Sequence, residues 1–227
     1  MPDNQSSYTY SPPPERALEI LYIDEEILAL NKPSGLLSVP GRGPDKDDCL
    51  LSRAQKDYPE LLAVHRLDMG TSGVILMARN KAMHRQLSAL FERRQVQKHY
   101  IARVYGKPNP QSAQIDSPLL GDWPNRPRQK IDWKSGKEAI THYQLQDHDA
   151  AKNTSLLQVK PVTGRSHQIR VHLASIGHPI LGDALYAPDH VIAMSQRLLL
   201  HAVSIVLNHP HTKQQLNIIC PAIFEQS

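Results

Sequence analysis

Short apolar stretches separated by turn-forming residues recur along most of this 227-residue chain. Its last part carries four of them, each about as long as a β-strand, at residues 138–146, 154–162, 197–207 and 214–222. Strands that follow one another closely in a sequence usually pair antiparallel. We therefore predict an α+β fold with a mixed, mainly antiparallel sheet and flanking helices and loops.

The first half of the chain adds further elements. Residues 18–39 (LEILYIDEEILALNKPSGLLSV) predict a hairpin of two apolar strands whose turn lies at residues 24–26. Residues 73–79 (GVILMAR) are nearly all apolar, as expected of a strand covered on both faces. Residues 49–58 predict a short helix, and the apolar spacing over residues 81–96 predicts an amphipathic helix with a basic outer side.

Three later segments matter for function. Residues 98–106 (KHYIARVYG) predict a strand with Tyr100 on its more apolar face. Residues 121–137 combine Lys and Arg with Trp123 and Trp133, and they predict either a basic aromatic loop or a hairpin. A helix is expected after residue 166. Ile169, Leu173 and Ile176 repeat there at helical spacing. Thr163 or Ser166 can cap the start of the helix, and Gly177 can end it.

Composition limits domain organisation and location. Residues 1–14, which contain SPPP, predict a disordered N-terminal extension, and residues 15–227 predict a single domain. Cys49 and Cys220 are far apart and have no CxxC partner, which indicates a reducing compartment. No stretch approaches the roughly 20 apolar residues that cross a bilayer, and the N-terminus lacks an apolar signal core. We expect a cytoplasmic protein without membrane contact, and a monomer with no obligate protein partner.

Charge is distributed unevenly along the chain. The net charge is only +4, but residues 66–107 carry nine Lys or Arg against the two acids Asp68 and Glu92. Clustered cations of this kind attract polyanions such as nucleic acids. A solvated helix face would explain the same pattern, so charge alone leaves both interpretations open.

The stretch VHRLDMGTSG, residues 64–73, places Asp68 between an apolar segment and a turn. A lone Asp in such a place is more often a surface residue paired with a neighbour such as Arg66. A rigidly held carboxylate is also what a nucleophile or base requires, and it needs a cation to stay ionised. Arg170, on the predicted helix about a hundred residues later, is a candidate for that cation.

Metal and nucleotide sites are not indicated. His167 and His172 are five residues apart, whereas helical metal ligands usually sit four apart, and no HExxH motif accompanies them. The chain contains no GxxxxGK[ST], GxGxxG or GxSxG motif. We therefore expect no metal and no cofactor.

Several ordered motifs together resemble the RluA-type pseudouridine synthases. They are NKPSGLLSVPG, HRLDMGTSGVILMAR, KHYIARVYG, KPVTGRSHQIRVHLASIGHPILGD and RLLLHA, and the resemblance covers about residues 18–222. Residues 118–143 resemble the dual-specificity subtype, which acts on 23S rRNA and a tRNA anticodon stem-loop. The resemblance implies a single catalytic domain without a preceding S4-like RNA-binding domain.

The resemblance also assigns residues. It makes Asp68 the catalytic aspartate, Arg170 its ion-pair partner and Tyr100 the active-site tyrosine that stacks on the target base. Arg66 falls where the family has an arginine that displaces the target uridine from its stack. The predicted RNA-binding residues, Arg66 included, are Arg66, His65, Arg165, Arg79, Arg126, Arg128 and Leu199. Gly70 is a departure, since relatives often carry a different small residue there.

The implied reaction breaks the N1–C1′ bond of uridine, rotates the uracil and rejoins it through C5, without a redox change. Asp68 could attack C1′, add to C6 of the ring or remove a sugar proton, and the sequence leaves these open. Tyr100 is a candidate for removing the C5 proton, although a phenol with an ordinary pKa near 10 is a poor base. The alternatives from other classes are a non-catalytic RNA-binding protein and a glycoside or nucleoside hydrolase.

Overall fold

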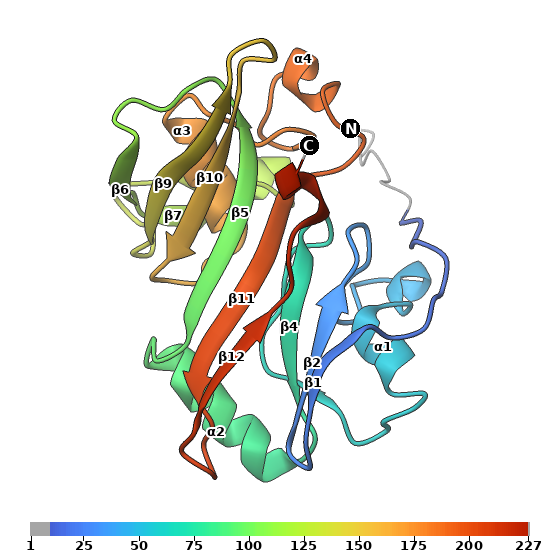
Figure 1. Cartoon of the computed structure of the whole chain (residues 1–227). Helices are drawn as coiled ribbons and strands as arrows, with labels where there is room; N and C mark the ends of the chain where they lie inside the picture. The colour runs from blue at the N-terminus through green and yellow to red at the C-terminus, as the bar shows by residue number, and fades with distance from the viewer. Residues whose placement is uncertain (1–9, 227) are drawn as a thin grey trace.

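The computed structural model describes residues 10–226 and contains one large, strongly curved sheet (Figure 1). Its strands follow the order β1-β2-β4-β11-β5-β10-β9-β6, with β3 added to β4 and β12 added to β11. Only β4 and β11 pair in parallel among the described strands. The predicted mixed, mainly antiparallel sheet is confirmed. The strands are β1 (Ile20–Ile23), β2 (Ile27–Lys32), β3 (Leu62–Ala63), β4 (Ser72–Ala78), β5 (Gln97–Tyr105), β6 (Ser112–Asp116), β9 (Ile140–Asp149), β10 (Thr154–Pro161), β11 (Leu200–Asn208) and β12 (Gln215–Ile219).

Strand β4 is buried along its whole length, as its apolar sequence predicts. Alternate residues face two different clusters, one with Val74 and Leu76 and the other with Ile75 and Met77. The first cluster includes helix α2 (Lys81–Glu92) and the second includes helix α1 (Leu50–Ala54). Both helices were expected from the sequence, and together they exclude water from the two faces of β4.

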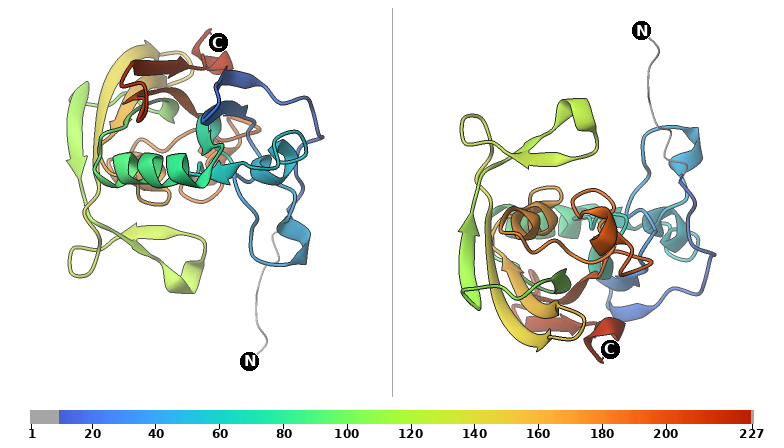
Figure 2. Two further views of the ribbon diagram at one scale, coloured as in Figure 1. Left: turned by 90° about the horizontal axis from the view of Figure 1, so that it is seen from below. Right: turned by 90° about the horizontal axis from the view of Figure 1, so that it is seen from above.

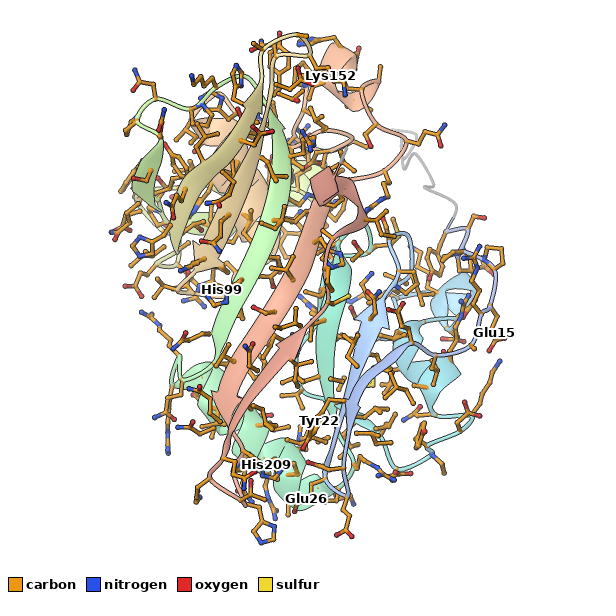
Figure 3. The ribbon with its side chains drawn as sticks, viewed as in Figure 1. Glu15, Tyr22, Glu26, His99, Lys152 and His209 are labelled. Atoms are coloured by element: carbon orange, nitrogen blue, oxygen red, sulfur yellow. The ribbon has the colours of Figure 1, made fainter. Side chains whose placement is uncertain are left out.

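The N-terminal hairpin is also confirmed, and its turn has a local cause. Asp24 Oδ1 accepts the backbone N–H groups of Glu26 and Ile27, at 2.8 and 2.7 Å. A side chain that caps its own turn in this way is typical of Asp. His209 Nε2 lies 3.2 Å from Asp24 Oδ2 and so links this turn to the β11–β12 turn. Figure 3 shows Tyr22, Glu26 and His209 gathered at that end of the sheet.

Residues 10–14 differ from the expectation of a disordered extension. Tyr10 is buried, and its hydroxyl donates to the carbonyl of Asp48 at 2.9 Å. The carbonyls of Pro13 and Pro14 accept hydrogen bonds from the Arg53 guanidinium. This segment orders because α1 supplies it with partners, which its own composition does not show. The rest of the predicted extension, residues 1–9, lies outside the described residues.

Helix α3 (Gln168–Ser175) packs against strands β10 and β9 of the large sheet (Figure 2). Ile169 and Leu173 are buried there as predicted, but Ile176 is 36% exposed because the helix ends before it. The predicted capping was wrong: neither Thr163 nor Ser166 caps the helix. The helix instead begins after His167, whose backbone is left-handed at φ 55°. Gly177 follows the end of the helix with φ 83°, as expected for a glycine terminator.

Residues 119–131 form a separate two-stranded hairpin, of β7 (Leu119–Gly121) and β8 (Gln129–Ile131), joined by a short 3-10 turn at Trp123–Asn125. The hairpin alternative predicted from the sequence is therefore confirmed. Figure 2 shows it standing apart from the large sheet, on the side where α3 lies. A short helix, α4 (Asp189–Ile192), precedes β11. Within residues 10–226, no helix has the length and apolar character needed to cross a lipid bilayer.

The parallel contact between β4 and β11 depends on a glycine. Gly73 has φ +108° and pairs with Ala202. A Cβ atom at this position would lie 2.2 Å from the carbonyl oxygen of Ala202. No side chain fits there without moving the two strands apart.

We predict that G73A destabilises the protein more than G43A does. Gly43 has nearly the same φ, +106°, but a Cβ there meets nothing within 4 Å, so it measures the backbone strain alone. Each substitution adds about 1–3 kcal/mol of backbone strain, and the contact with Ala202 adds about 1–3 kcal/mol to G73A only. Urea unfolding of both variants tests this, and equal losses would contradict it.

Candidate active site

Asp68 lies in the loop between β3 and β4, and the segment that follows β2 is hydrogen-bonded to this loop. Ser34 Oγ donates to the carbonyl of Gly70 at 2.7 Å, and Ser38 Oγ donates to that of Leu67 at 2.8 Å. Hydroxyl bonds on both sides fix the backbone around Asp68. The motif NKPSGLLS therefore serves the site although it contributes no reacting group.

Lys32 holds the same loop from inside the protein. Its side chain is fully buried, and its ammonium donates to the carbonyls of Pro33, Leu36 and Met69 at 2.9, 2.6 and 3.0 Å. Burial lowers the pKa of Lys32 to about 7, and the negative charge of Asp68 opposes that shift. Lys32 thus holds the carbonyl of Met69, the residue that follows Asp68, from inside the protein.

Arg170 connects Asp68 to a second carboxylate. Its Nε and Nη2 atoms donate to the two oxygens of Asp183, at 2.8 and 2.6 Å, in a bidentate pair. Its remaining Nη1 points to Asp68 Oδ2 at 3.4 Å. The side chains of Arg170 and Asp183 are 8% and 1% exposed, whereas that of Asp68 is 26% exposed. The guanidinium is therefore fixed inside the protein and presents one N–H to an accessible carboxylate.

Tyr100 reaches the site from the centre of the sheet. It pairs with Ala202 on β11, which pairs on its other side with Gly73 of β4. Burial and the negative charge of Asp68 both raise the pKa of Tyr100 well above its ordinary value near 10. The phenol is therefore protonated at neutral pH, which favours stacking and hydrogen-bond donation over proton removal.

His167 and Tyr186 complete the surroundings of Asp68. His167 Nε2 lies 3.9 Å from Asp68 Oδ1, and its Nδ1 is 2.7 Å from the hydroxyl of Tyr186. The Arg170 guanidinium lies over the Tyr186 ring, 5.1 Å from its centroid. Asp68 is thus bordered by a fixed cation, an imidazole and the phenol of Tyr100.

Two of the predicted RNA-binding arginines, Arg66 and Arg165, are exposed on the segments that border Asp68 and His167. Arg66 Nη2 donates to the hydroxyl of Ser166 at 3.3 Å, and Arg165 Nε donates to the carbonyl of Glu138 at 2.9 Å. Asp68 pairs with Arg170 and not with its neighbour in the sequence, Arg66. The local surface ion pair considered from the sequence is therefore wrong.

Arg126 and Arg128 are exposed on the β7–β8 hairpin. Arg126 stacks on the Trp123 ring, and Arg128 lies 5.6 Å from the centroid of the Tyr186 ring. The hairpin therefore carries two cations on the side of α3, and one of them reaches a residue that touches the site.

Three other predicted RNA-binding residues lie away from Asp68 or face inward. His65 Nε2 accepts the N–H of Leu76 at 2.9 Å and its ring stacks on Phe91, while burial lowers its pKa to about 3. Leu199 packs against two core clusters. Arg79 follows the end of β4 opposite to Asp68, and Glu60 pairs with it at 2.9 Å. Each of these side chains has partners within the protein, and the predicted RNA contacts of all three stay predictions.

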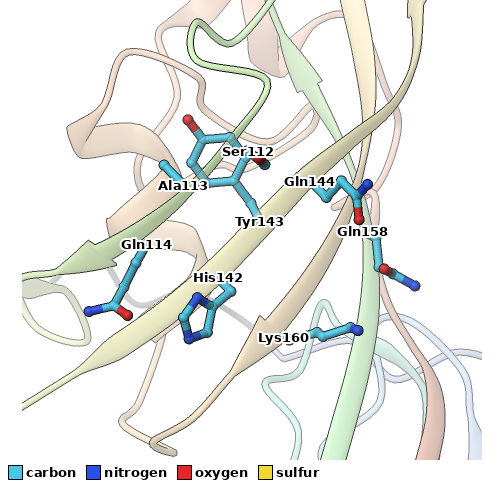
Figure 4. A pocket seen from close by; sticks show the side chains of 8 residues that line it. All are labelled: Ser112, Ala113, Gln114, His142, Tyr143, Gln144, Gln158 and Lys160. Carbon is cyan, nitrogen blue, oxygen red and sulfur yellow. The ribbon is translucent and has the colours of Figure 1, made fainter.

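A pocket of about 510 Å³ lies elsewhere, on β6, β9 and β10 (Figure 4). Polar side chains dominate its lining, among them Gln114, His142, Gln144 and Lys160. Asp68, Tyr100 and Arg170 do not contribute to it. The catalytic candidates therefore lie outside this pocket.

Comparison with known proteins identifies the family. A model of RNA pseudouridylate synthases matches residues 26–175, which include Asp68, Tyr100 and Arg170. The chain belongs to this family. It is 50% identical over 215 residues to the dual-specificity RNA pseudouridine synthase RluA of Escherichia coli K12, covering 95% of this chain and 98% of that protein. The RluA of Yersinia pestis is 48% identical over 205 residues, covering 90% of this chain and 99% of that one.

Solved structures of the family agree with the fold. Human RNA pseudouridylate synthase domain containing 1 superposes with a TM-score of 0.78 at 26% identity, covering 93% of this chain and 86% of that chain. Human RNA pseudouridylate synthase domain containing 4 superposes with a TM-score of 0.71 at 27% identity, covering 89% of this chain and 88% of that chain. The protein is an RNA pseudouridine synthase, and family membership favours this isomerase over the RNA-binding and hydrolase alternatives.

The sequence interpretation of this pseudouridine synthase missed four residues that surround Asp68: Lys32, His167, Asp183 and Tyr186. Asp183 ends the motif HPILGD, and a Gly-Asp pair after a buried apolar run was an available signal. Lys32 was visible as a lone cation after an apolar strand. His167 was considered only as a metal ligand, and Tyr186 stands in no motif.

We predict that Asp183→Asn destabilises the pseudouridine synthase by about 3 kcal/mol, because it leaves the buried Arg170 without its bidentate partner. Chemical unfolding followed by circular dichroism measures the loss. Glu15→Gln removes an exposed pair with Lys56 and serves as the control, with an unchanged unfolding midpoint expected. Similar midpoints for both variants would contradict the prediction.

Proposed function

We propose that this pseudouridine synthase isomerises uridines in both 23S rRNA and a tRNA anticodon stem-loop, with Asp68 as the reacting carboxylate. The observation that carries the assignment to Asp68 is its geometry: a partly exposed carboxylate held by a buried, bidentate Arg170. The dual substrate range rests on the relatives in Escherichia coli and Yersinia pestis, which are dual-specificity enzymes and match nearly their full lengths.

The residues of the site suit a reaction that breaks and remakes a glycosidic bond. An ionised Asp68 can attack C1′, add to C6 or remove a sugar proton, and each route returns the carboxylate at the end. Arg170 holds the carboxylate in position before the reaction. Tyr100 supplies a ring against which the uracil stacks, and it stays a phenol while it does so. No cofactor enters this scheme, because the uracil leaves and returns with its own electrons.

The substrate uridine must leave its stack to reach Asp68. Extrusion costs a few kcal/mol, and stacking on an aromatic ring together with phosphate contacts offsets it. Arg66 is exposed two residues before Asp68 and contacts Ser166, which supports a role for it in entering the space left by the uridine. Arg165 is exposed beside it for a phosphate contact.

We further propose that the enzyme acts as a monomer in the cytoplasm, where its RNA substrates are made. One chain supplies every residue placed around Asp68. Light scattering at micromolar concentration is expected to give the mass of one chain, and the mass of a dimer would overturn this part of the proposal.

Asp68→Asn is expected to abolish turnover, with at least a thousandfold loss, because an amide is neither a nucleophile nor a base. Tritium release from RNA containing 5-tritiated uridine measures turnover. Asp57→Asn is the control, since Asp57 is exposed and outside the site. If the Asp68→Asn enzyme is active, Asp68 is not the reacting carboxylate. Free uracil among the wild-type products would instead indicate a hydrolase.

Replacing Arg126 and Arg128 together by Gln is expected to reduce kcat/KM at least tenfold on one or both stem-loops, because the hairpin loses two exposed cations near the site. The rRNA and tRNA stem-loops are assayed separately, and the loss is expected to shrink at high salt. The matched control replaces Lys152 and Lys107, which are exposed in other loops. Unchanged activity on both RNAs would exclude the hairpin from substrate recognition.

A further inference from the structure

His167 occupies a strained position beside Asp68. It is one of four non-glycine residues with positive φ among the described residues, and it sits at the start of α3 with φ 55° and ψ 15°. A left-handed residue costs free energy and persists where the surrounding structure determines it. Its ring is 13% exposed and faces Asp68 on one side and Tyr186 on the other. The strain therefore places an imidazole between a hydroxyl and the proposed reacting carboxylate.

The partners of Tyr186 determine which nitrogen of His167 carries the proton. The Tyr186 oxygen already accepts the backbone N–H of Gln129 at 2.8 Å. Its own O–H is then free to donate to His167 Nδ1, 2.7 Å away. Burial lowers the pKa of His167, which favours the neutral ring. A neutral ring that accepts at Nδ1 carries its proton at Nε2, and Nε2 is the atom that faces Asp68.

We propose that His167 is a positioning residue for Asp68: Tyr186 holds it in the tautomer whose Nε2–H points at the Asp68 carboxylate. This inference rests on the proposed role of Asp68. The opposite tautomer would direct a lone pair at a negative carboxylate, which electrostatics disfavours. The present separation, 3.9 Å, is longer than a hydrogen bond, and such contacts in free enzymes often tighten in the substrate complex.

His167 and Arg170 contact different oxygens of the same carboxylate. Arg170 addresses Oδ2 and His167 addresses Oδ1, so the two together fix the plane of the Asp68 carboxylate. The other titratable groups that interact electrostatically with Asp68 are Lys32, Tyr100 and Tyr186. Around metal ligands, partners that orient the ligating group are typically worth about 10–100-fold in affinity or activity, and we expect an effect of that order here.

Two substitutions of His167 separate its two contacts. Asn tolerates a left-handed backbone, and its short amide can still accept from Tyr186 but cannot reach Asp68. Gln is longer, and its amide N–H can replace Nε2–H toward Asp68. We expect H167N to lower kcat at least tenfold with KM nearly unchanged, and H167Q to retain more of kcat than H167N.

The pH profile distinguishes positioning from a general structural role. A carboxylate that loses a hydrogen-bond donor is protonated more easily, so the acid limb of kcat is expected to move to higher pH in H167N and less in H167Q. Tyr186→Phe removes the hydroxyl that fixes the tautomer, and a smaller shift in the same direction is expected. Melting temperatures of all variants show whether the fold is retained.

His142→Asn is the matched control, because His142 is exposed on β9 at the pocket of Figure 4, whose lining includes neither Asp68 nor His167. It is expected to leave kcat and the pH profile unchanged. Wild-type kcat in H167N would overturn the inference, and so would equal losses in H167N and H167Q without a shift of the acid limb. Asp68→Asn is assayed alongside: if it is inactive while H167N is normal, only the role of His167 fails, whereas an active Asp68→Asn enzyme contradicts the proposed function itself.

Discussion

The buried pair between Arg170 and Asp183 is the interaction on which the site depends. A guanidinium with one partner removed would be an uncompensated charge inside the protein, so both residues must be in place for either to be tolerated. Asp183 is itself fixed, since its Oδ1 accepts the backbone N–H of Leu185 at 3.0 Å. The pair thereby fastens α3 to the segment before α4, and it leaves one N–H of Arg170 to meet Asp68. Stability and catalytic geometry come from the same contact.

The sheet brings the other half of the site to that guanidinium. Tyr100, Ala202 and Gly73 lie side by side across β5, β11 and β4, although they come from three distant parts of the chain. Neighbouring strands are about 4.8 Å apart, so Tyr100 and the start of β4 are separated by only about 10 Å. Because Gly73 lets β4 approach β11 closely, the Asp68 loop just before it is carried toward Tyr100. A mainly antiparallel sheet with one parallel contact thus assembles residues that are not adjacent in sequence.

Much of the fold could be predicted because its elements have local causes. Short apolar stretches identified the β1–β2 hairpin, β4 and the C-terminal strands, the alternation of faces identified β5, and the helical spacing identified α2 and α3. The start of α3 could not be predicted in this way, since His167 adopts a left-handed conformation that only its tertiary partners explain. Residues 10–14 order for a similar reason, through Arg53. For the site, Asp68, Tyr100 and Arg170 followed from motifs, whereas Tyr186 lies in no motif and is defined by contacts alone.

Burial limits what Tyr100 can do. Burial is the larger cause of the raised pKa of Tyr100, and the negative charge of Asp68 is the smaller one. If Asp68 forms a bond to the substrate or takes a proton, its charge disappears and the smaller cause goes with it. The larger cause remains, and a bound uracil would increase it by excluding more water. In the proposed reaction we therefore expect Tyr100 to stay a phenol, and we expect the regenerated Asp68 carboxylate, beside Arg170, to accept the C5 proton of the product.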